Sequence, residues 1–147
     1  MQDIITREVI INAPQKDIYE AIANPEKVIQ WFPDAIEGNY AVGEQPLFVF
    51  EGHGKAQMYV VEANPYEYFA YQWIPGGSDF VGDVRTVPHT IVAFRIQEEG
   101  DETCKVTLTE SGFSSLPDDT GEKAFNMNSG GWDYFMLDAF QKYFDKK

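Results

Sequence analysis

The chain has 147 residues, of which 44% are hydrophobic and 15% aromatic, so it can form one domain with one core. Its formal net charge of −13 argues against a nucleic-acid partner, because a binding surface must neutralise phosphates with Lys and Arg. The same charge argues against anionic membrane surfaces, and no apolar run approaches the roughly 20 residues of a membrane span. We therefore expect a single domain over residues 1–147, with no nucleic-acid or membrane partner.

Two features of the sequence bear on its compartment. Cys104 is the one cysteine, which excludes an internal disulfide and fits a reducing environment. The first residues begin directly in a strand pattern, without a basic region followed by an apolar stretch, so we expect no secretory signal. The predicted location is the cytoplasm.

The first part of the chain predicts a strand followed by two short helices. Residues 3–12 alternate between apolar and polar side chains, which is typical of a strand with one buried face. Pro14 stops this strand and suits the first turn of a helix. Asn24 and Pro25 break that helix, and a second short helix is predicted over about 25–32.

Short alternating stretches separated by Gly-, Pro- and Asn-rich turns fill the middle of the chain. They predict six strands in a meander, at roughly 35–40, 46–51, 55–63, 67–74, 89–98 and 103–112. A longer Gly- and Asp-rich loop, residues 76–87, joins the fourth and fifth of these strands. Its Phe80 and Val81 are a candidate contact patch for another protein.

The C-terminal part predicts one long amphipathic helix from about Trp132 onward. Trp132, Met136, Phe140 and Tyr143 recur at three- and four-residue spacing, which places them on one face. Residues 113–121 are predicted to connect the last strand to this helix, with Asp119 or Thr120 as candidate caps. Since so wide an apolar face must cover something large, we expect an α+β fold with a sheet of about seven antiparallel strands and its helices on one side.

Several motifs, taken together, resemble a known family. They are Ala13-Pro14-x-x-x-Ile18-Tyr19-x-Ala21-Ile22, Asn24-Pro25-Glu26, Trp31-Phe32, Asn64-Pro65 with Phe69, Tyr71 and Trp73, the run from Thr107 to Phe113, and Gly130-Gly131-Trp132. Over nearly the whole chain they resemble the homologues of the heat-shock-protein-90 ATPase activator, within the START/polyketide-cyclase (SRPBCC) superfamily. The resemblance implies a helix-grip fold with a hydrophobic pocket between the sheet and the long helix, and it implies no shared catalytic residue.

Strand and helix periodicity predict which side chains would line such a pocket. The candidates are Arg7, Phe69, Tyr71, Trp73, Val92, Phe94, Leu108, Glu110, Trp132, Phe135, Met136 and Ala139. Plain core packing explains any one of these residues as well. Arg7 and Glu110 stand out because a charge on an inner face is costly unless it is paired. We hypothesise that these two residues pair near the pocket and anchor a polar group of a ligand.

The sequence shows no recognisable catalytic or metal-binding constellation. His53 lies between glycines in a turn and His89 follows a proline, and neither has a second ligand at a familiar metal spacing. The acidic residues at 117–122 lack the calcium-loop pattern, and Cys104 has the pattern of a small core residue. We therefore expect no metal and no cofactor, and the catalytic residues, if any, are unknown.

Three functions remain open at this point. The first is a small binding domain for an apolar or aromatic, lipid-like or polyketide-like, molecule held between sheet and helix. The second is an enzyme of the cyclase, dehydratase or hydrolase type in which Glu110, Arg7, Tyr71 or a histidine acts as acid or base. The third is an interaction module, with a chaperone or a second copy as partner, so that the protein would be a monomer or a weak homodimer.

Overall fold

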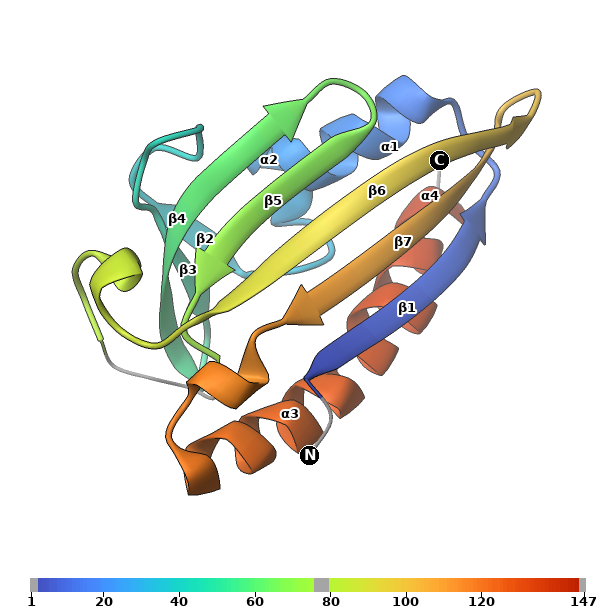
Figure 1. The fold of residues 1–147 in the computed structure, drawn as a ribbon. Coiled ribbons are helices and arrows are strands. Elements are labelled where there is room, and N and C mark those ends of the chain that lie inside the picture. The colour runs from blue at the N-terminus through green and yellow to red at the C-terminus, as the bar shows by residue number, and fades with distance from the viewer. Residues whose placement is uncertain (1–2, 76–79, 146–147) are drawn as a thin grey trace.

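The structure is a computed structural model that describes residues 3–75 and 80–145. Seven strands form one antiparallel sheet in the order β1-β7-β6-β5-β4-β3-β2 (Figure 1). Their bounds are β1 Ile4–Ile11, β2 Ala35–Glu37, β3 Leu47–Phe50, β4 Gly54–Asn64, β5 Tyr68–Trp73, β6 Thr90–Gly100 and β7 Thr103–Ser111. The seven predicted strands are therefore confirmed, with ends that differ from the prediction by at most three residues.

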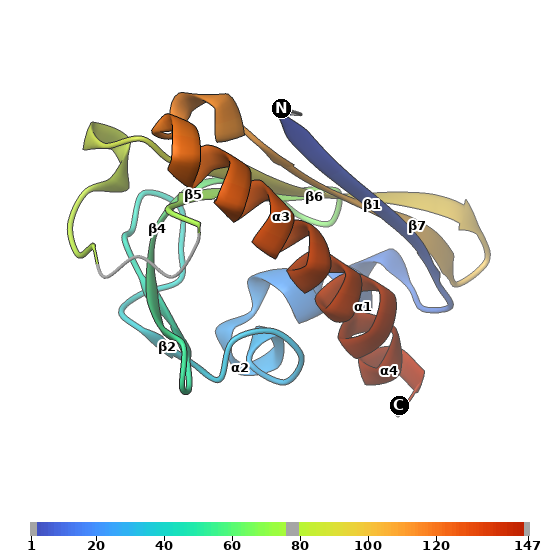
Figure 2. The ribbon, with the colours of Figure 1, turned by 90° about the horizontal axis from the view of Figure 1, so that it is seen from below.

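The helices all lie on the concave face of the curved sheet. They are α1 Gln15–Ala23, α2 Pro25–Val28, α3 Asp118–Tyr134, the π-helical turn η3 Phe135–Ala139 and α4 Phe140–Asp145. Two short 3₁₀ turns lie in the connections, η1 Val84–Thr86 before β6 and η2 Phe113–Ser115 after β7. Figure 2 shows α3 to α4 running as one rod across this face, with α1 and α2 beside it. This arrangement confirms the α+β helix-grip fold. No helix in the described ranges is long and apolar enough to cross a membrane.

The start of the C-terminal helix was predicted wrongly. It begins at Asp118, not near Trp132, so Asp119 and Thr120 lie in its first turn and do not cap it. The residue before the helix is Pro117, which forms no side-chain cap. Residues 118–131 include three glycines and several Asn and Ser, all weak helix formers. Tertiary packing overrides this weak propensity, for example where the ring of Phe125 in α3 meets that of Phe113 at 5.2 Å.

An aromatic cluster occupies the space between the C-terminal helix and the sheet. Its hub is Phe32, which follows α2 and is only 7% exposed. The ring centroid of Phe32 lies 4.8–6.0 Å from those of Phe48, Phe50, Trp73, Trp132 and Phe135. These rings come from both sides of the space, so Phe32 joins the helix and the sheet through aromatic contacts.

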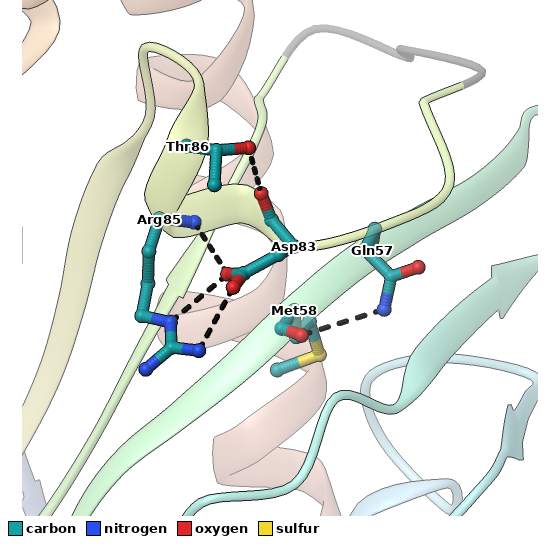
Figure 3. A network of polar contacts seen from close by, with 5 residues as sticks. All are labelled: Gln57, Met58, Asp83, Arg85 and Thr86. Carbon is teal, nitrogen blue, oxygen red and sulfur yellow. Dashed lines mark hydrogen bonds and ion pairs between the residues drawn. The ribbon is translucent and has the colours of Figure 1, made fainter.

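The loop before β6 is fastened to the face of β4 that points away from the core. Asp83 binds the Arg85 guanidinium at 2.8 Å and accepts a hydrogen bond from its backbone, while the Thr86 hydroxyl donates to the Asp83 carbonyl (Figure 3). The buried Gln57 accepts from the backbone N–H of Gly82 at 3.0 Å. Val81 remains 70% exposed. The first part of the predicted loop, residues 76–79, lies outside the described residues.

Gly112 provides a direct test of the backbone at the end of β7. Its φ is 98°, and an added Cβ would lie 3.3 Å from the carbonyl oxygen of His89. We expect Gly112→Ala to lower the free energy of unfolding by about 2 kcal/mol in urea denaturation, because alanine is strained at positive φ. Gly100→Ala is the control, since a Cβ there meets nothing within 4 Å. Equal losses in the two variants would contradict the argument.

Candidate functional site

A carboxylate lies at the centre of the interface between the C-terminal helix and the sheet. Glu110 on β7 is 0% exposed. Its Oε2 accepts from Trp73 Nε1 at 2.8 Å and from the Thr90 hydroxyl at 2.6 Å. Its Oε1 accepts from Trp132 Nε1 at 2.8 Å, and Asn128 Nδ2 donates to both oxygens at 2.9 and 3.1 Å. These donors occupy the lone-pair positions that a carboxylate offers.

The donors to Glu110 come from three different elements. Trp73 ends β5, Thr90 begins β6, and Asn128 and Trp132 are one turn apart on α3. An i,i+4 pair shares one face of a helix, so both donors reach the same carboxylate. Glu110 therefore ties α3 to three neighbouring strands. Its oxygens are fully engaged and screened from solvent, so the structure does not support Glu110 as an acid or base acting on a substrate.

Arg7 faces α3 as predicted, but the hypothesis that it pairs with Glu110 is wrong. Its Nε donates to Asp133 Oδ1 at 2.7 Å, and its NH2 group donates to the hydroxyl and carbonyl of Ser129 at 2.8 and 3.0 Å. The reason is register, since the residue opposite Glu110 on β1 is Ile5 and Arg7 lies opposite Leu108. Arg7 thus forms a second link between β1 and α3.

A groove opens beside this interface, and we call it the first groove. Its volume is about 540 Å³. Its apolar walls are Phe32, Phe50, Trp73, Trp132, Tyr134 and Phe135, with Ala56, Ile74, Pro75, Met127 and Gly131 between them. Its polar members are His53, Lys55 and Asn128. The turn between β3 and β4 thus forms one rim, and α3 forms the other.

A second groove of about 690 Å³ lies next to the first. The two grooves share Phe32, Phe50, His53, Tyr134 and Phe135. The second groove continues along the π-helical turn η3 and α4, where Ala139, Lys142 and Tyr143 line it. It also includes Asp34 and is more polar at its edge. Phe32 and Phe135, whose ring centroids are 4.8 Å apart, line both grooves.

Apart from Arg7 and Glu110, the pocket residues predicted from sequence separate into two groups. Trp73, Trp132, Phe135 and Ala139 line one or both grooves. Phe69, Tyr71, Val92, Phe94, Leu108 and Met136 are at most 2% exposed and pack in the core, and they are not among the residues that line either groove. A ligand contact by any of these residues stays a prediction.

Several residues that line the grooves were not predicted from the sequence. Phe32 and Phe50 fall in the predicted second helix (25–32) and in the predicted strand 46–51, and neither was named as a pocket candidate. Asn128 lies between the predicted connector, residues 113–121, and the predicted start of the helix near Trp132. His53 was predicted to be an exposed turn histidine, and it is exposed, but it also lies on the rim of both grooves. Its position between two glycines in a hairpin carries no sequence signal for a ligand site.

Tyr71 carries a buried polar atom that the fold leaves unused. Its side chain is 0% exposed, and its hydroxyl has no hydrogen-bond partner among the described residues. Burial raises the pKa of this phenol well above its usual value, with smaller contributions from Tyr40 and Glu110. The hydroxyl therefore stays neutral at physiological pH. No group of three His, Cys, Asp or Glu side chains in the described ranges is arranged to hold a metal.

The hydrogen bonds around Glu110 predict that replacing its carboxylate by an amide destabilises the fold strongly. In Glu110→Gln, an amide N–H₂ would face the donors that now bind a carboxylate oxygen. We expect the free energy of unfolding to fall by about 3 kcal/mol, because buried donors lose their acceptor. Urea denaturation monitored by tryptophan fluorescence measures this. Glu8→Gln, at an exposed position on β1, is the matched control, and a similar small effect in both variants would refute the role of Glu110.

Removing the hydroxyl of either of two buried tyrosines should change stability differently, because one hydroxyl donates a hydrogen bond and the other has no partner. Tyr40 donates its hydroxyl to the Ile22 carbonyl at 2.9 Å, whereas the Tyr71 hydroxyl has no partner. We expect Tyr40→Phe to cost about 1 kcal/mol, and Tyr71→Phe to be neutral or stabilising by up to about 1 kcal/mol. Thermal or urea unfolding of the two variants compares them directly. A clear loss of stability in Tyr71→Phe would show that its hydroxyl is satisfied in solution.

Several solved structures share the fold of this chain. Among solved structures, protein MLL2253 from Mesorhizobium loti superposes with a TM-score of 0.78 at 19% identity, covering 98% of both chains. The Aha1 dimer from Colwellia psychrerythraea gives 0.75 at 19% identity over 97% of this chain and 96% of that one. A norcoclaurine synthase point mutant from Thalictrum, in complex with a transition-state analogue, gives 0.65 at 14% identity over 97% and 94%.

At these identities the structural likeness shows the fold alone. A search among curated proteins finds no match. Residues 12–145, however, match the family model described as "Activator of Hsp90 ATPase homolog 1-like protein", which covers most of the described elements from α1 to α4. The chain therefore belongs to the family of Activator of Hsp90 ATPase homolog 1-like proteins.

Proposed function

We propose that the protein binds an apolar or aromatic small molecule in the first groove. The observation that carries this proposal is the state of the two tryptophans in its wall. The Nε1 atoms of Trp73 and Trp132 both donate to Glu110, so the polar atom of each indole is already satisfied inside the protein. What the indoles contribute to the groove is therefore apolar ring surface, which favours an apolar partner.

The size and position of the first groove support the same function. About 540 Å³ falls within the range of small-molecule sites, which is roughly 300–1,000 Å³. Burial of apolar surface would supply the affinity at about 25 cal/mol per Å². The norcoclaurine synthase structure, which shares the fold, was solved with a transition-state analogue, so this fold holds a small molecule in at least one relative.

An enzyme that uses the same groove is the second candidate. One observation favours it, namely that His53 lies on the rim of both grooves. Of the acid–base groups named from the sequence, Glu110 is occupied by four donors and Arg7 is held by Asp133 and Ser129. His53 is therefore the group to replace first if a reaction is found, with His53→Gln as the variant.

The interaction-module alternative concerns a different surface and a different measurement. Val81, in the loop before β6, is 70% exposed, and one structural relative is described as a dimer. A chaperone partner or a homodimer would use such a surface. Light scattering across a concentration series would detect a homodimer, and Val81→Asp would weaken a dimer that forms through this loop.

Two neighbouring glycines allow a sharp test of binding in the first groove. Gly131 lines the groove and Gly130 is exposed beside it, and a Cβ at either position meets nothing within 4 Å. We expect Gly131→Leu to weaken binding of the neutral dye phenylnaphthylamine at least about tenfold, a loss of 1.4 kcal/mol, because leucine fills the groove. Gly130→Leu should leave binding unchanged.

Fluorescence titration of the dye measures both affinities, and circular dichroism checks that the variants are folded. Both substitutions add the same side chain to the same helix, so a general effect on helix stability would appear in both. Absence of dye binding by the parent protein, or equal binding by the two variants, would overturn the proposed site.

A further inference from the structure

One face of the C-terminal helical rod lines both grooves. The residues of the rod in the first groove are Met127, Asn128, Gly131, Trp132, Tyr134 and Phe135. Those in the second groove are Tyr134, Phe135, Ala139, Lys142 and Tyr143. They recur at spacings of three and four residues, the period of one helix face, along the rod that Figure 2 shows as continuous. The two grooves are therefore successive parts of one channel.

The opposite wall of this channel also has members in both grooves. Phe32, Phe50 and His53 line the first groove and the second. The ring centroid of Phe32 lies 5.6 Å from that of Phe50 and 4.8 Å from that of Phe135, so aromatic surface lies where the grooves meet. From Met127 to Tyr143 the rod extends about 24 Å at a helical rise of roughly 1.5 Å per residue. The channel is thus longer than a two-ring molecule.

The first groove offers few polar groups to a ligand. The indole N–H groups of its wall and the Nδ2 of Asn128 already donate to Glu110. Lys55 follows the other face of β4, because adjacent residues of a strand point to opposite faces and its neighbour Ala56 faces the groove and the core. His53 on the rim is left to bind a polar atom, so this part of the channel is mainly aromatic.

The second groove is richer in hydrogen-bonding groups. Its polar members are Gln30, Asp34, His53, Lys142 and Tyr143. Asp34 uses its Oδ2 to accept from the backbone N–H of Glu51 at 2.7 Å. Lys142 pairs with Asp138 at 2.9 Å, where the two side chains are 66% and 44% exposed, and such a pair contributes little to stability. A ligand can therefore compete for Lys142, and the channel changes from aromatic to polar along its length.

We infer that the two grooves together bind one elongated amphiphile. Its apolar end lies against the indoles of the first groove, its middle crosses Phe32 and Phe135, and a hydroxyl or another hydrogen-bonding group at its far end lies in the second groove. This inference rests on the proposed function and adds the length and the direction of the ligand. Gly131 and Ala139 lie on the channel face of the rod on either side of Phe135, so each groove can be filled separately by a substitution.

Calorimetric titration with naphthylethanol and naphthylhexanol tests the length of the site. The two probes share the ring system and the hydroxyl, and they differ by four methylenes. A fully buried methylene increases affinity about fourfold, so we expect naphthylhexanol to bind at least about tenfold more tightly. Equal affinities in the parent protein would overturn the inference without the need for any variant.

Two variants test the direction of the ligand. Ala139→Leu, which fills the second groove, should weaken naphthylhexanol about tenfold and leave naphthylethanol unchanged. Gly131→Leu, which fills the first groove, should weaken both alcohols. Gln141→Leu is the control, since it adds leucine to the same rod at a described residue outside both groove linings, and it should change neither affinity.

Circular dichroism checks that these variants are folded. If Ala139→Leu does not fold, Ala139→Met takes its place, because methionine is flexible and a good helix former. A preference for naphthylhexanol that neither Ala139 variant reduces would place the chain outside the second groove and overturn the inference.

The outcomes also distinguish this inference from the proposed function. Equal binding of the two alcohols, both weakened by Gly131→Leu, would remove the channel and leave the first groove as a small-molecule site. Binding of neither alcohol, together with no dye binding, would overturn both.

Discussion

The buried carboxylate of Glu110 is the interaction on which the rest of the structure depends. Removing a charge from water is costly, and no cation among the described residues binds this carboxylate to compensate for it. Neutral donors do so instead, namely Trp73 and Thr90 from the sheet and Asn128 and Trp132 from α3. Each donor would be left unsatisfied without the carboxylate. The network is therefore complete in one rotational setting of α3 about its axis relative to the sheet.

The Arg7 contacts strengthen this constraint at the sheet edge. Ser129 and Asp133, which bind Arg7, each follow directly after one of the residues of α3 that bind Glu110. Two adjacent i,i+4 pairs therefore fasten the same two turns of α3, one to β7 and one to β1. Gly131 lies within the span of both pairs and lines the first groove without filling it. The groove exists because the helix is held firmly at residues that flank a position with no side chain.

The same network explains the character of the groove. Because Glu110 takes the indole N–H groups, the groove presents ring surface inside, with His53 on its rim. The π-helical turn Phe135–Ala139 follows immediately, and its first residue, Phe135, lines both grooves. Turns of this kind are often found at functional sites, where they alter the direction of side chains within a helix. The apolar character of the groove thus follows from the hydrogen bonds that Trp73 and Trp132 donate to the buried Glu110.

Local periodicity in the sequence predicted the strands, an α+β sheet with its helices on one side and the inward direction of Arg7, Glu110 and Trp132, because alternation and helical spacing depend on neighbours a few residues away. The helix-grip fold was implied by the family resemblance of the motifs. Local periodicity missed the first four turns of α3, where weak helix formers are stabilised only by packing. It also paired Glu110 with Arg7, whereas the tertiary structure gives Glu110 neutral donors. Which groups meet depends on register and helix rotation, and these are set by contacts between residues up to 126 positions apart in the chain. For the same reason, only the tertiary structure could place His53 at the rim of a groove.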